Sequence, residues 1–383
     1  MPKPAPDILV IGGGVIGLVS AFTLQRAGLN VGLLEARRIG AGASGWAGGI
    51  VRRLHDDRDD VDRAAAGLHI LRDLRRAIGV DVPFHETGYV RFPEGATADS
   101  QTAIAGRSGL NGNRRLSPGI ARLTAEGAVI WQDHAALERI YPGFAAQGPG
   151  AWLEPAAGWA DPRLVCLAYG QAFVRLGGAL LEGIRVDGIS PVAGRVTLST
   201  TLGEMCARHV VLALGDGLPG FLDLHGFDHA FYVKPIEVAL FAPPGPCHAP
   251  CFTDDAYDVY GKPDADGRSV HIGHSRDRHA GAVPGAAPLD AAHLGATLSA
   301  AASRFPWIRQ AVVHGGVCHG ECFHESGKPV VDALDAGAGT DADLARIIVA
   351  GGFSGTGIKM APWAAGRILE LIRERGDAGG GGA

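Results

Sequence analysis

A lysine stands in an apolar, glycine-rich stretch near the C-terminus, 351-GGFSGTGIKMAP-362. Its neighbours suit the interior of a protein, where a buried ammonium group costs free energy unless an anion meets it. The stretch therefore raises the question of which anion lies beside Lys359 in the folded chain. The alternative is that Lys359 extends its apolar stem and places its charge in solvent.

Three glycines near the N-terminus, Gly12, Gly14 and Gly17, follow the pattern G-x-G-x-x-G. In a strand-to-helix turn the first permits the tight turn, the second lets a pyrophosphate approach the backbone, and the third allows close helix–sheet packing. Glu35 follows Gly17 by 18 residues, where a carboxylate can accept hydrogen bonds from both hydroxyls of an adenosine ribose. Together they predict a dinucleotide site.

The elements that must position these residues can be read from the same segment. Residues 7–11 are expected to form a buried strand, 15–27 a helix that ends at Gly28, and 31–34 a second strand. A plain NAD domain would continue with further βα units, whereas here a Gly/Ser/Ala-rich loop follows, which disfavours an NAD(P) enzyme.

Two later strand–glycine junctions, 207-ARHVVLALGDG-217 and 344-LARIIVAGGFSGTG-357, indicate one dinucleotide domain assembled from separated segments. The blocks between them, such as KPIEVALFA and SVHIGHS, suit an inserted antiparallel sheet.

Composition places the chain among ordinary globular proteins. It has 383 residues, 46% hydrophobic and 20% charged, with a net charge of −5. This balance argues against a nucleic-acid or anionic-membrane surface, so neither partner is expected. The first apolar run is explained by the glycine motif rather than by a signal peptide or membrane helix, so we expect a cytoplasmic protein. Its six cysteines do not suggest a disulfide framework.

At this point the chain resembles the D-amino-acid oxidase (DAO) superfamily of FAD enzymes, in particular its glycine oxidase and sarcosine oxidase branch. The order and spacing of several short motifs carry the resemblance: VIGGGVIGL, Glu35, GASGWAGG, HETGYV, LERIYPGF, GWADPRLV, VVLALGDG and GGFSGTGIKMAP. It implies an α/β fold of the glutathione-reductase-2 type, in which an FAD-binding Rossmann-like domain is interleaved with a substrate domain built on an antiparallel β-sheet.

The resemblance also implies how the chain alternates between the two domains. Residues 1–82, 151–230 and 321–375 are expected in the FAD-binding domain, and residues 83–150 and 231–320 in the substrate domain. The last residues, 376–383, read GDAGGGGA and are expected to be a disordered tail.

By the same resemblance, FAD lies along the three glycine-rich junctions, with its diphosphate at the N-terminus of the first helix. The loop before the last helix would bring that helix's positive dipole end to the flavin, where it stabilises the reduced anion. The residues implied to bind FAD are Gly12, Gly14, Val15, Ile16, Gly17, Glu35, Ala36, Arg37, Ala43, Ser44, Gly45, Gly48, Gly49, Val186, Ala213, Gly215, Gly352, Ser354, Gly355, Thr356, Gly357 and Ile358.

The resemblance assigns Lys359 to the substrate. Related enzymes place a lysine of this segment in front of the flavin to bind the substrate carboxylate, and a second anchor, an arginine, falls on Arg52. The implied reaction is oxidation of the C–N bond of a small amino acid or N-substituted amino acid, with hydrolysis of the imine and transfer of electrons to O2. No catalytic base is nominated. The alternative for Arg52 is a solvated side chain beside Arg53.

Three positions depart from the related enzymes. The cysteine that bonds the flavin covalently in some of them falls on His319, next to Cys318, so FAD is expected to be non-covalent, with a cysteinyl link at Cys318 as an alternative. The usual substrate-site tyrosine falls on Glu321. A carboxylate there would repel a simple amino-acid carboxylate but could pair with a second amine on the substrate, as in a diamino acid or another basic, N-substituted amino acid. The alternative is a surface glutamate in a polar loop. The lysine that assists O2 falls on His271, and a histidine is only partly protonated near pH 7.

Several alternatives remain open at this stage. The pairs Cys247-x3-Cys251 and Cys318-x3-Cys322 fit zinc spacing poorly, so no metal is expected. The same fold could instead serve a dehydrogenase with another electron acceptor, or a flavoprotein that modifies a partner protein. The substrate and the choice between monomer and homo-oligomer are not determined.

Overall fold

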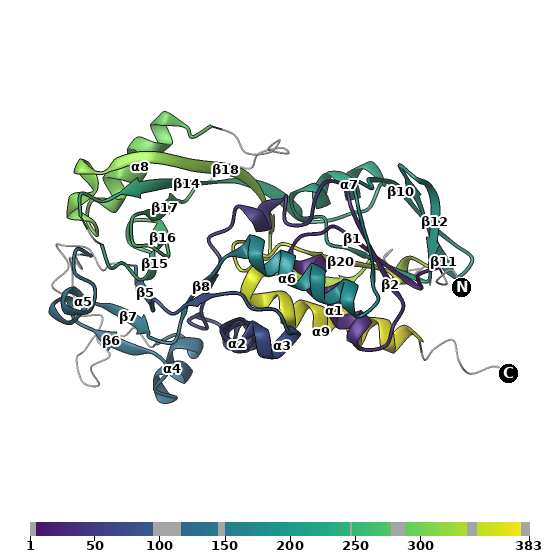
Figure 1. The fold of residues 1–383 in the computed structure, drawn as a ribbon, viewed down its shortest axis with the longest axis horizontal. Coiled ribbons are helices and arrows are strands. Elements are labelled where there is room, and N and C mark those ends of the chain that lie inside the picture. The colour runs from purple at the N-terminus through teal and green to yellow at the C-terminus, as the bar shows by residue number, and fades with distance from the viewer. Residues whose placement is uncertain are drawn as a thin grey trace.

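The computed structural model describes residues 5–94, 116–144, 150–245, 247–276, 288–334 and 343–376. Two sheet-based regions lie side by side along the longest axis (Figure 1). The first and last segments of the chain meet in one of them, where β1, α1, β20 and α9 lie together, and the second region is built from the middle of the chain. The predicted interleaved α/β fold is confirmed.

The first region is a six-stranded sheet whose strands come from across the chain. Their order is β19-β20-β13-β1-β2-β9, parallel throughout except for β19. Their bounds are β1 (Ile8–Ile11), β2 (Val31–Glu35), β9 (Ala179–Glu182), β13 (His209–Leu212), β19 (Val330–Ala333) and β20 (Ile347–Gly351). The central strands β1, β13 and β20 are wholly buried, as their uninterrupted apolar sequences require in a sheet covered on both faces.

Helices pack against this sheet and against one another. Helix α1 leaves the turn after β1 and packs against α9 and α6, and α9 also packs against α2. Their bounds are α1 (Val15–Arg26), α2 (Arg58–Arg72), α6 (Pro162–Arg175) and α9 (Gly357–Gly376). The N-termini of α1 and α9 therefore both lie at the carboxyl edge of the parallel strands, the edge where ligands bind in open α/β sheets.

The second region is an eight-stranded sheet in the order β18-β14-β17-β16-β15-β5-β7-β6, antiparallel except where β15 meets β5. The bounds are β5 (Tyr89–Phe92), β6 (Ile130–Gln132), β7 (Ala151–Glu154), β14 (Phe231–Ala242), β15 (Cys251–Asp254), β16 (Val259–Pro263), β17 (Val270–His274) and β18 (Val312–His324). Strand β14 alternates strictly between buried and half-buried residues. Ala239 and Phe241 of its buried face join an apolar core with α8 (Ala291–Ala301), and its half-buried face carries Lys234, Ile236 and Val238 toward the first region.

Smaller elements complete the described chain. Two three-stranded sheets have the orders β10-β11-β12 and β3-β8-β4. The remaining bounds are β3 (Ile50–Val51), β4 (Phe84–His85), β8 (Gly158–Ala160), β10 (Val186–Val192), β11 (Arg195–Thr200), β12 (Gly203–Ala207), α3 (Leu74–Ile78), α4 (Pro118–Ala125), α5 (His134–Ile140) and α7 (Leu218–Leu224), with 3-10 turns at Ala43–Gly45, Gly215–Gly217, Pro306–Gln310 and Leu344–Arg346.

Two strands cross the boundaries expected between the domains. Strand β7 pairs with β5 and β6 in the eight-stranded sheet, although residues from 151 onward are expected in the FAD-binding domain. Strand β18 continues to His324 along its full pairing with β14, past residue 320. An apolar strand pattern does not say which sheet the strand joins. The expected tail lies outside the described residues apart from Gly376, which ends α9.

Among the described residues, none of the helices combines the length and the apolar character needed to cross a membrane.

Candidate active site

A cavity of about 810 Å³ lies between the two regions. Its walls come from the β1–α1 turn, the end of β2, the loop before β3, one face of the eight-stranded sheet and the segment from β20 into α9. The cavity gathers Arg52, His271, Glu321 and Lys359, together with all the predicted cofactor residues except Gly17 and Gly45. Its size falls in the range usual for ligand sites.

The glycine turn after β1 has the geometry that the motif predicts. Gly12 has φ +108°, and a Cβ there would overlap the carbonyl of Ala213. A Cβ on Gly17 would overlap the carbonyl of Gly12, so this glycine serves close packing and does not line the cavity. Gly14 is different, because its Cβ would point toward the Ser44 hydroxyl, 3.1 Å away.

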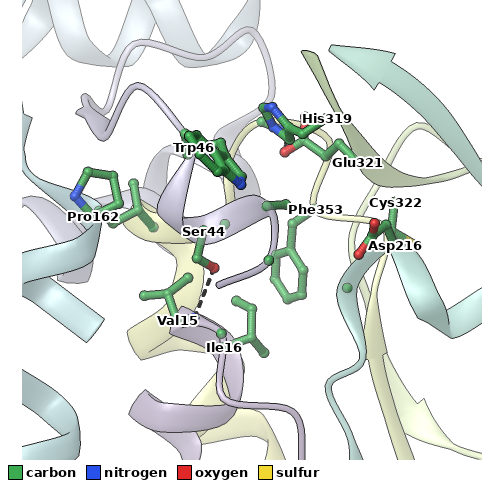
Figure 2. Close-up of a pocket in the computed structure, with 18 of the residues that line it drawn as sticks. Val15, Ile16, Ser44, Trp46, Pro162, Asp216, His319, Glu321, Cys322 and Phe353 are labelled. Carbon is green, nitrogen blue, oxygen red and sulfur yellow. Dashed lines mark hydrogen bonds between the residues drawn. The ribbon is translucent and has the colours of Figure 1, made fainter. Parts of the chain in front are cut away.

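The N-terminus of α1 opens into the cavity. Gly14 is its N-cap and offers no side chain, and the first turn carries no acidic residue. The Val15 N–H donates to the Ser44 hydroxyl at 3.0 Å (Figure 2). A helix start without its own acidic cap is a ready anion site, so the turn fits the diphosphate of a dinucleotide.

Glu35 lies at the end of β2 beside this turn. Its Oε2 accepts the Gly13 N–H at 2.6 Å and its Oε1 accepts the Arg37 N–H at 2.7 Å. Each carboxylate oxygen can accept a further hydrogen bond, which leaves capacity for ribose hydroxyls. Val186 lines the same cavity. These residues fit the adenosine end of the predicted FAD.

The loop before β3 is held from outside the cavity. Arg163 at the start of α6 donates through Nε to the Gly45 carbonyl at 2.7 Å, and its guanidinium lies 4.6 Å from the centre of the Trp46 ring. Gly45 therefore faces the protein and not the cavity, in contrast to the prediction. Trp46, which the sequence analysis did not select, lines the cavity instead (Figure 2).

Lys359 lies in the first turn of α9 and is only 3% exposed. Helices α2 and α9 approach closely here, since a Cβ on Gly67 would overlap the Lys359 carbonyl. Within the described chain the ammonium group has no hydrogen bond or ion pair. Burial, reinforced by the nearby charge of Arg52, holds the pKa of Lys359 well below its usual value. A snorkelling surface lysine is therefore excluded.

Arg52 is brought to the same place from the loop after β3. Its guanidinium stacks 4.6 Å from the centre of the Tyr89 ring and donates to the Leu54 carbonyl. Glu154, 1% exposed, accepts the backbone N–H groups of Arg53 and Leu54 at 2.8–3.0 Å. The Arg53 side chain forms ion pairs with Glu126 at 3.3 Å and with Glu154 at 3.9 Å.

Tyr89 and Glu154 are direct partners in β5 and β7. Opposite residues of an antiparallel pair lie on the same face of the sheet. Tyr89 therefore stacks on the Arg52 guanidinium while Glu154, beside it, holds the backbone that follows Arg52. Neither residue stands out in the sequence. The alternation of apolar residues that predicts β5 and β7 does not show that these strands contact the segment from Arg52 to Leu54.

Strand β18 presents His319 and Glu321 to the cavity (Figure 2). His319 is 5% exposed, burial lowers its pKa to about 4, and its Nδ1 has no partner in the described structure. Glu321 accepts the Gly355 N–H at 2.8 Å, and burial raises its pKa against the opposing effect of that hydrogen bond and of Lys359.

Cys318 does not line the cavity. It alternates with His319 along β18, and burial raises the pKa of its thiol, with the Glu237 carboxylate acting in the same direction. A neutral thiol outside the wall does not suit attachment to a flavin inside it. Both cysteine pairs are buried free thiols, and the described residues contain no cluster of three or more His, Cys, Asp or Glu able to hold a metal ion.

His271 lines the cavity, but its Nε2 is hydrogen-bonded to Asp264 at 2.7 Å. Directly opposite His271 in β16 stands Lys262, 5% exposed, with its Nζ 3.6 Å from Asp264 and 3.4 Å from the centre of the Trp159 ring. Burial lowers the pKa of Lys262, and Asp264 opposes that shift. The sequence does not mark Lys262 as a site residue. It comes two residues before the hairpin turn that leads to His271, and only the pairing of β16 with β17 shows that the two residues are opposite each other.

A glycine turn at a strand-to-helix junction, a carboxylate at the end of the second strand and a cavity under an antiparallel sheet are features of a two-domain dinucleotide-dependent oxidoreductase. Comparison with known families agrees: residues 7–371 match the DAO family, described as FAD-dependent oxidoreductase. The chain belongs to this family, and FAD is its cofactor.

Individual relatives are distant. A glycine oxidase of Bacillus licheniformis is 24% identical over 234 residues, which are 59% of this chain and 58% of the relative. The fold is shared with the glycine oxidase of Geobacillus kaustophilus (TM-score 0.75, 21% identity, 97% of this chain and 95% of the other). It is also shared with the L-proline dehydrogenase of P. horikoshii (TM-score 0.81, 20% identity, 98% and 94%).

Proposed function

We propose that this protein oxidises the C–N bond of a small amino acid or N-substituted amino acid to an imine, which then hydrolyses, and that O2 receives the electrons. The observation that carries the proposal is the pair of cations, Arg52 and Lys359, on one wall of the cavity. Neither has a carboxylate within ion-pair distance in the described structure, and Lys359 is buried. A buried cation of this kind calls for an anionic ligand.

FAD, bound non-covalently, supplies the redox chemistry. The Gly12–Gly14 turn, the start of α1 and Glu35 would hold its diphosphate and adenosine, and the His319 Nδ1 offers a free polar atom to a bound group. Arg52 and Lys359 bind the substrate carboxylate and so fix the α-carbon in one orientation, which removes much of the entropy cost of the reaction.

The purified protein is expected to be yellow and to release FAD, not FMN, into the supernatant on acid precipitation. Anaerobic addition of glycine, sarcosine or L-proline should bleach the flavin absorbance with at least one of the three, since all carry the carboxylate that the cations bind. A colourless protein, or a flavin that no amino acid bleaches, would contradict the proposal. Flavin that stays with the precipitated protein would contradict non-covalent binding.

Reaction with oxygen is expected to depend on Lys262 more than on His271. A buried ammonium stabilises the negative charge that develops on oxygen, whereas the Nε2 of His271 is committed to Asp264. Lys262→Met should therefore slow reoxidation by about 10²-fold, and His271→Asn much less. Because burial lowers the pKa of Lys262, the wild-type rate should fall as pH rises through that lowered value.

Stopped-flow mixing of the reduced protein with oxygenated buffer measures this rate. Equal rates for wild type and Lys262→Met would remove Lys262 from the oxygen reaction. Slow reoxidation of the wild type by O2, with fast reoxidation by a dye, would favour the dehydrogenase alternative.

A further inference from the structure

An amino acid reaches the active site with a charged nitrogen. At neutral pH its amine is an ammonium group, which has no lone pair on nitrogen. Loss of a hydride from the neighbouring carbon would leave two positive charges on one C–N unit. The ammonium must therefore lose a proton first, and the cavity must supply a group that receives it.

The described cavity wall contains three carboxylates: Glu35, Asp216 and Glu321. Glu35 is engaged by the backbone N–H groups of Gly13 and Arg37 at the adenosine end. Asp216 follows β13, and its side chain lies against Gly320 and Cys322 of β18 (Figure 2). The cation that acts on Asp216 is Arg37, and Asp216 is not among the charges that act on Lys359. Glu321 is the carboxylate coupled electrostatically to Lys359, the proposed carboxylate anchor.

The geometry fixes one oxygen of Glu321 and leaves the other available. Its Oε1 accepts the Gly355 N–H at 2.8 Å, which ties the side chain to the loop before α9. Its Oε2 forms no hydrogen bond or ion pair within the described residues. Glu321 lies two residues after His319 in β18, so both side chains are on the strand face that lines the cavity (Figure 2). Lys359 lines the same cavity.

We propose that Glu321 is a catalytic residue that binds the substrate ammonium group and accepts its proton. This inference rests on the proposed function, in which Arg52 and Lys359 bind the substrate carboxylate. It assigns the substrate ammonium group to Glu321 in the same site. The N–H bond breaks, an O–H bond forms on Glu321, and the electron pair stays on nitrogen. After imine release the proton passes to solvent, which restores the carboxylate.

The charged groups around Glu321 suit this role. Lys359 and Lys234, its direct partner in β14, are nearby cations that favour the ionised form of Glu321 and so oppose the effect of burial on its pKa. Burial and the charge of Glu321 both raise the pKa of Tyr260 in β16, so this residue stays neutral. Burial lowers the pKa of His319, so its ring is also neutral. Burial makes Glu321 a stronger base than an exposed carboxylate, because it raises the pKa of the group.

The sign of the pH dependence follows. Only ionised Glu321 accepts a proton, so kcat/KM should rise with pH through the raised pKa of Glu321. It should fall again at higher pH, where Lys359, whose pKa burial lowers, loses the proton that makes it a cation. In Glu321→Gln the amide can still accept the Gly355 N–H but cannot take up the proton. Reaction then requires substrate that is already neutral, so kcat/KM should climb one decade per pH unit until the amine pKa of the substrate.

The experiment uses holoenzyme with bound FAD and follows anaerobic flavin reduction by sarcosine, glycine and L-proline from pH 5 to pH 10. Glu321→Gln should lose about 10²- to 10⁴-fold in reduction rate at pH 7 and recover most of it at pH 10. Glu325→Gln, the same change at an exposed position just after β18, is the matched control and should behave as wild type. Binding of butanoate, which has the shape of sarcosine without the amine, should stay within about twofold of wild type.

The outcomes separate the two proposals. A Glu321→Gln protein with the wild-type pH profile would overturn the role of Glu321 while the proposed function stands. Weakened butanoate binding together with an unchanged profile would also overturn it, because Glu321 would then only shape the loop at Gly355. A wild-type flavin that none of the three amino acids reduces would instead refute the proposed function itself.

Discussion

Gly14→Val is expected to produce a folded protein that purifies without FAD. A Cβ at position 14 would lie 3.1 Å from the Ser44 hydroxyl, which itself accepts the Val15 N–H at the start of α1. The two methyl groups of valine would extend further, into the space where the diphosphate must meet the helix N-terminus. We expect FAD occupancy below about a tenth of wild type, because the diphosphate contacts are central to binding a dinucleotide at such a turn.

The ratio of flavin to protein absorbance measures this loss. Gly366→Val is the matched control, since the same substitution in α9 meets open space. Circular dichroism should show both variants folded. Full flavin content in folded Gly14→Val would mean that the diphosphate does not pass over this turn.

Lys359→Met and Arg52→Ala are expected to keep FAD and to lose substrate capture. Each removes one of the two cations that we propose bind a single substrate carboxylate. Truncating one partner of such a pair costs about 2–5 kcal/mol, or about 30-fold to several thousand-fold in affinity. Butanoate titrated against the flavin spectrum measures the carboxylate contact alone, and flavin bleaching by sarcosine measures its effect on the reaction.

Arg53→Ala is the matched control for Arg52. The two arginines are adjacent in sequence, but the Arg53 side chain pairs with Glu126 and Glu154 and does not line the cavity. Its replacement should change butanoate affinity less than about threefold, as expected for a partly exposed ion pair. Wild-type affinity in both Lys359→Met and Arg52→Ala would place the carboxylate elsewhere.

The double variant tests whether the two cations act on one group. If both contact the same carboxylate, their combined loss should be smaller than the sum of the single losses, because neither contact is independent of the other. Strict additivity would indicate two separate sites.

The sequence by itself determined the dinucleotide half of this protein. The roles of Gly12, Gly14 and Glu35 depend on spacing within one βαβ unit, where the chain connects the residues directly and the geometry is local. The interleaved sheets also followed from strand patterns, because a strand buried on both faces and a strand buried on one face differ in apolar period. The order of the separated glycine-rich junctions then placed the cavity.

Only the tertiary structure decided which polar side chains face that cavity. Cys318 and His319 are neighbours in sequence, and the pleat of β18 turns one into the protein and the other toward the ligand. Lys262 became a buried cation because β16 pairs with β17 in a register that sets it opposite His271 and over Trp159. Strand register is set by contacts between residues far apart in the chain, and burial by the packing of whole sheets, so neither can be read from one segment alone.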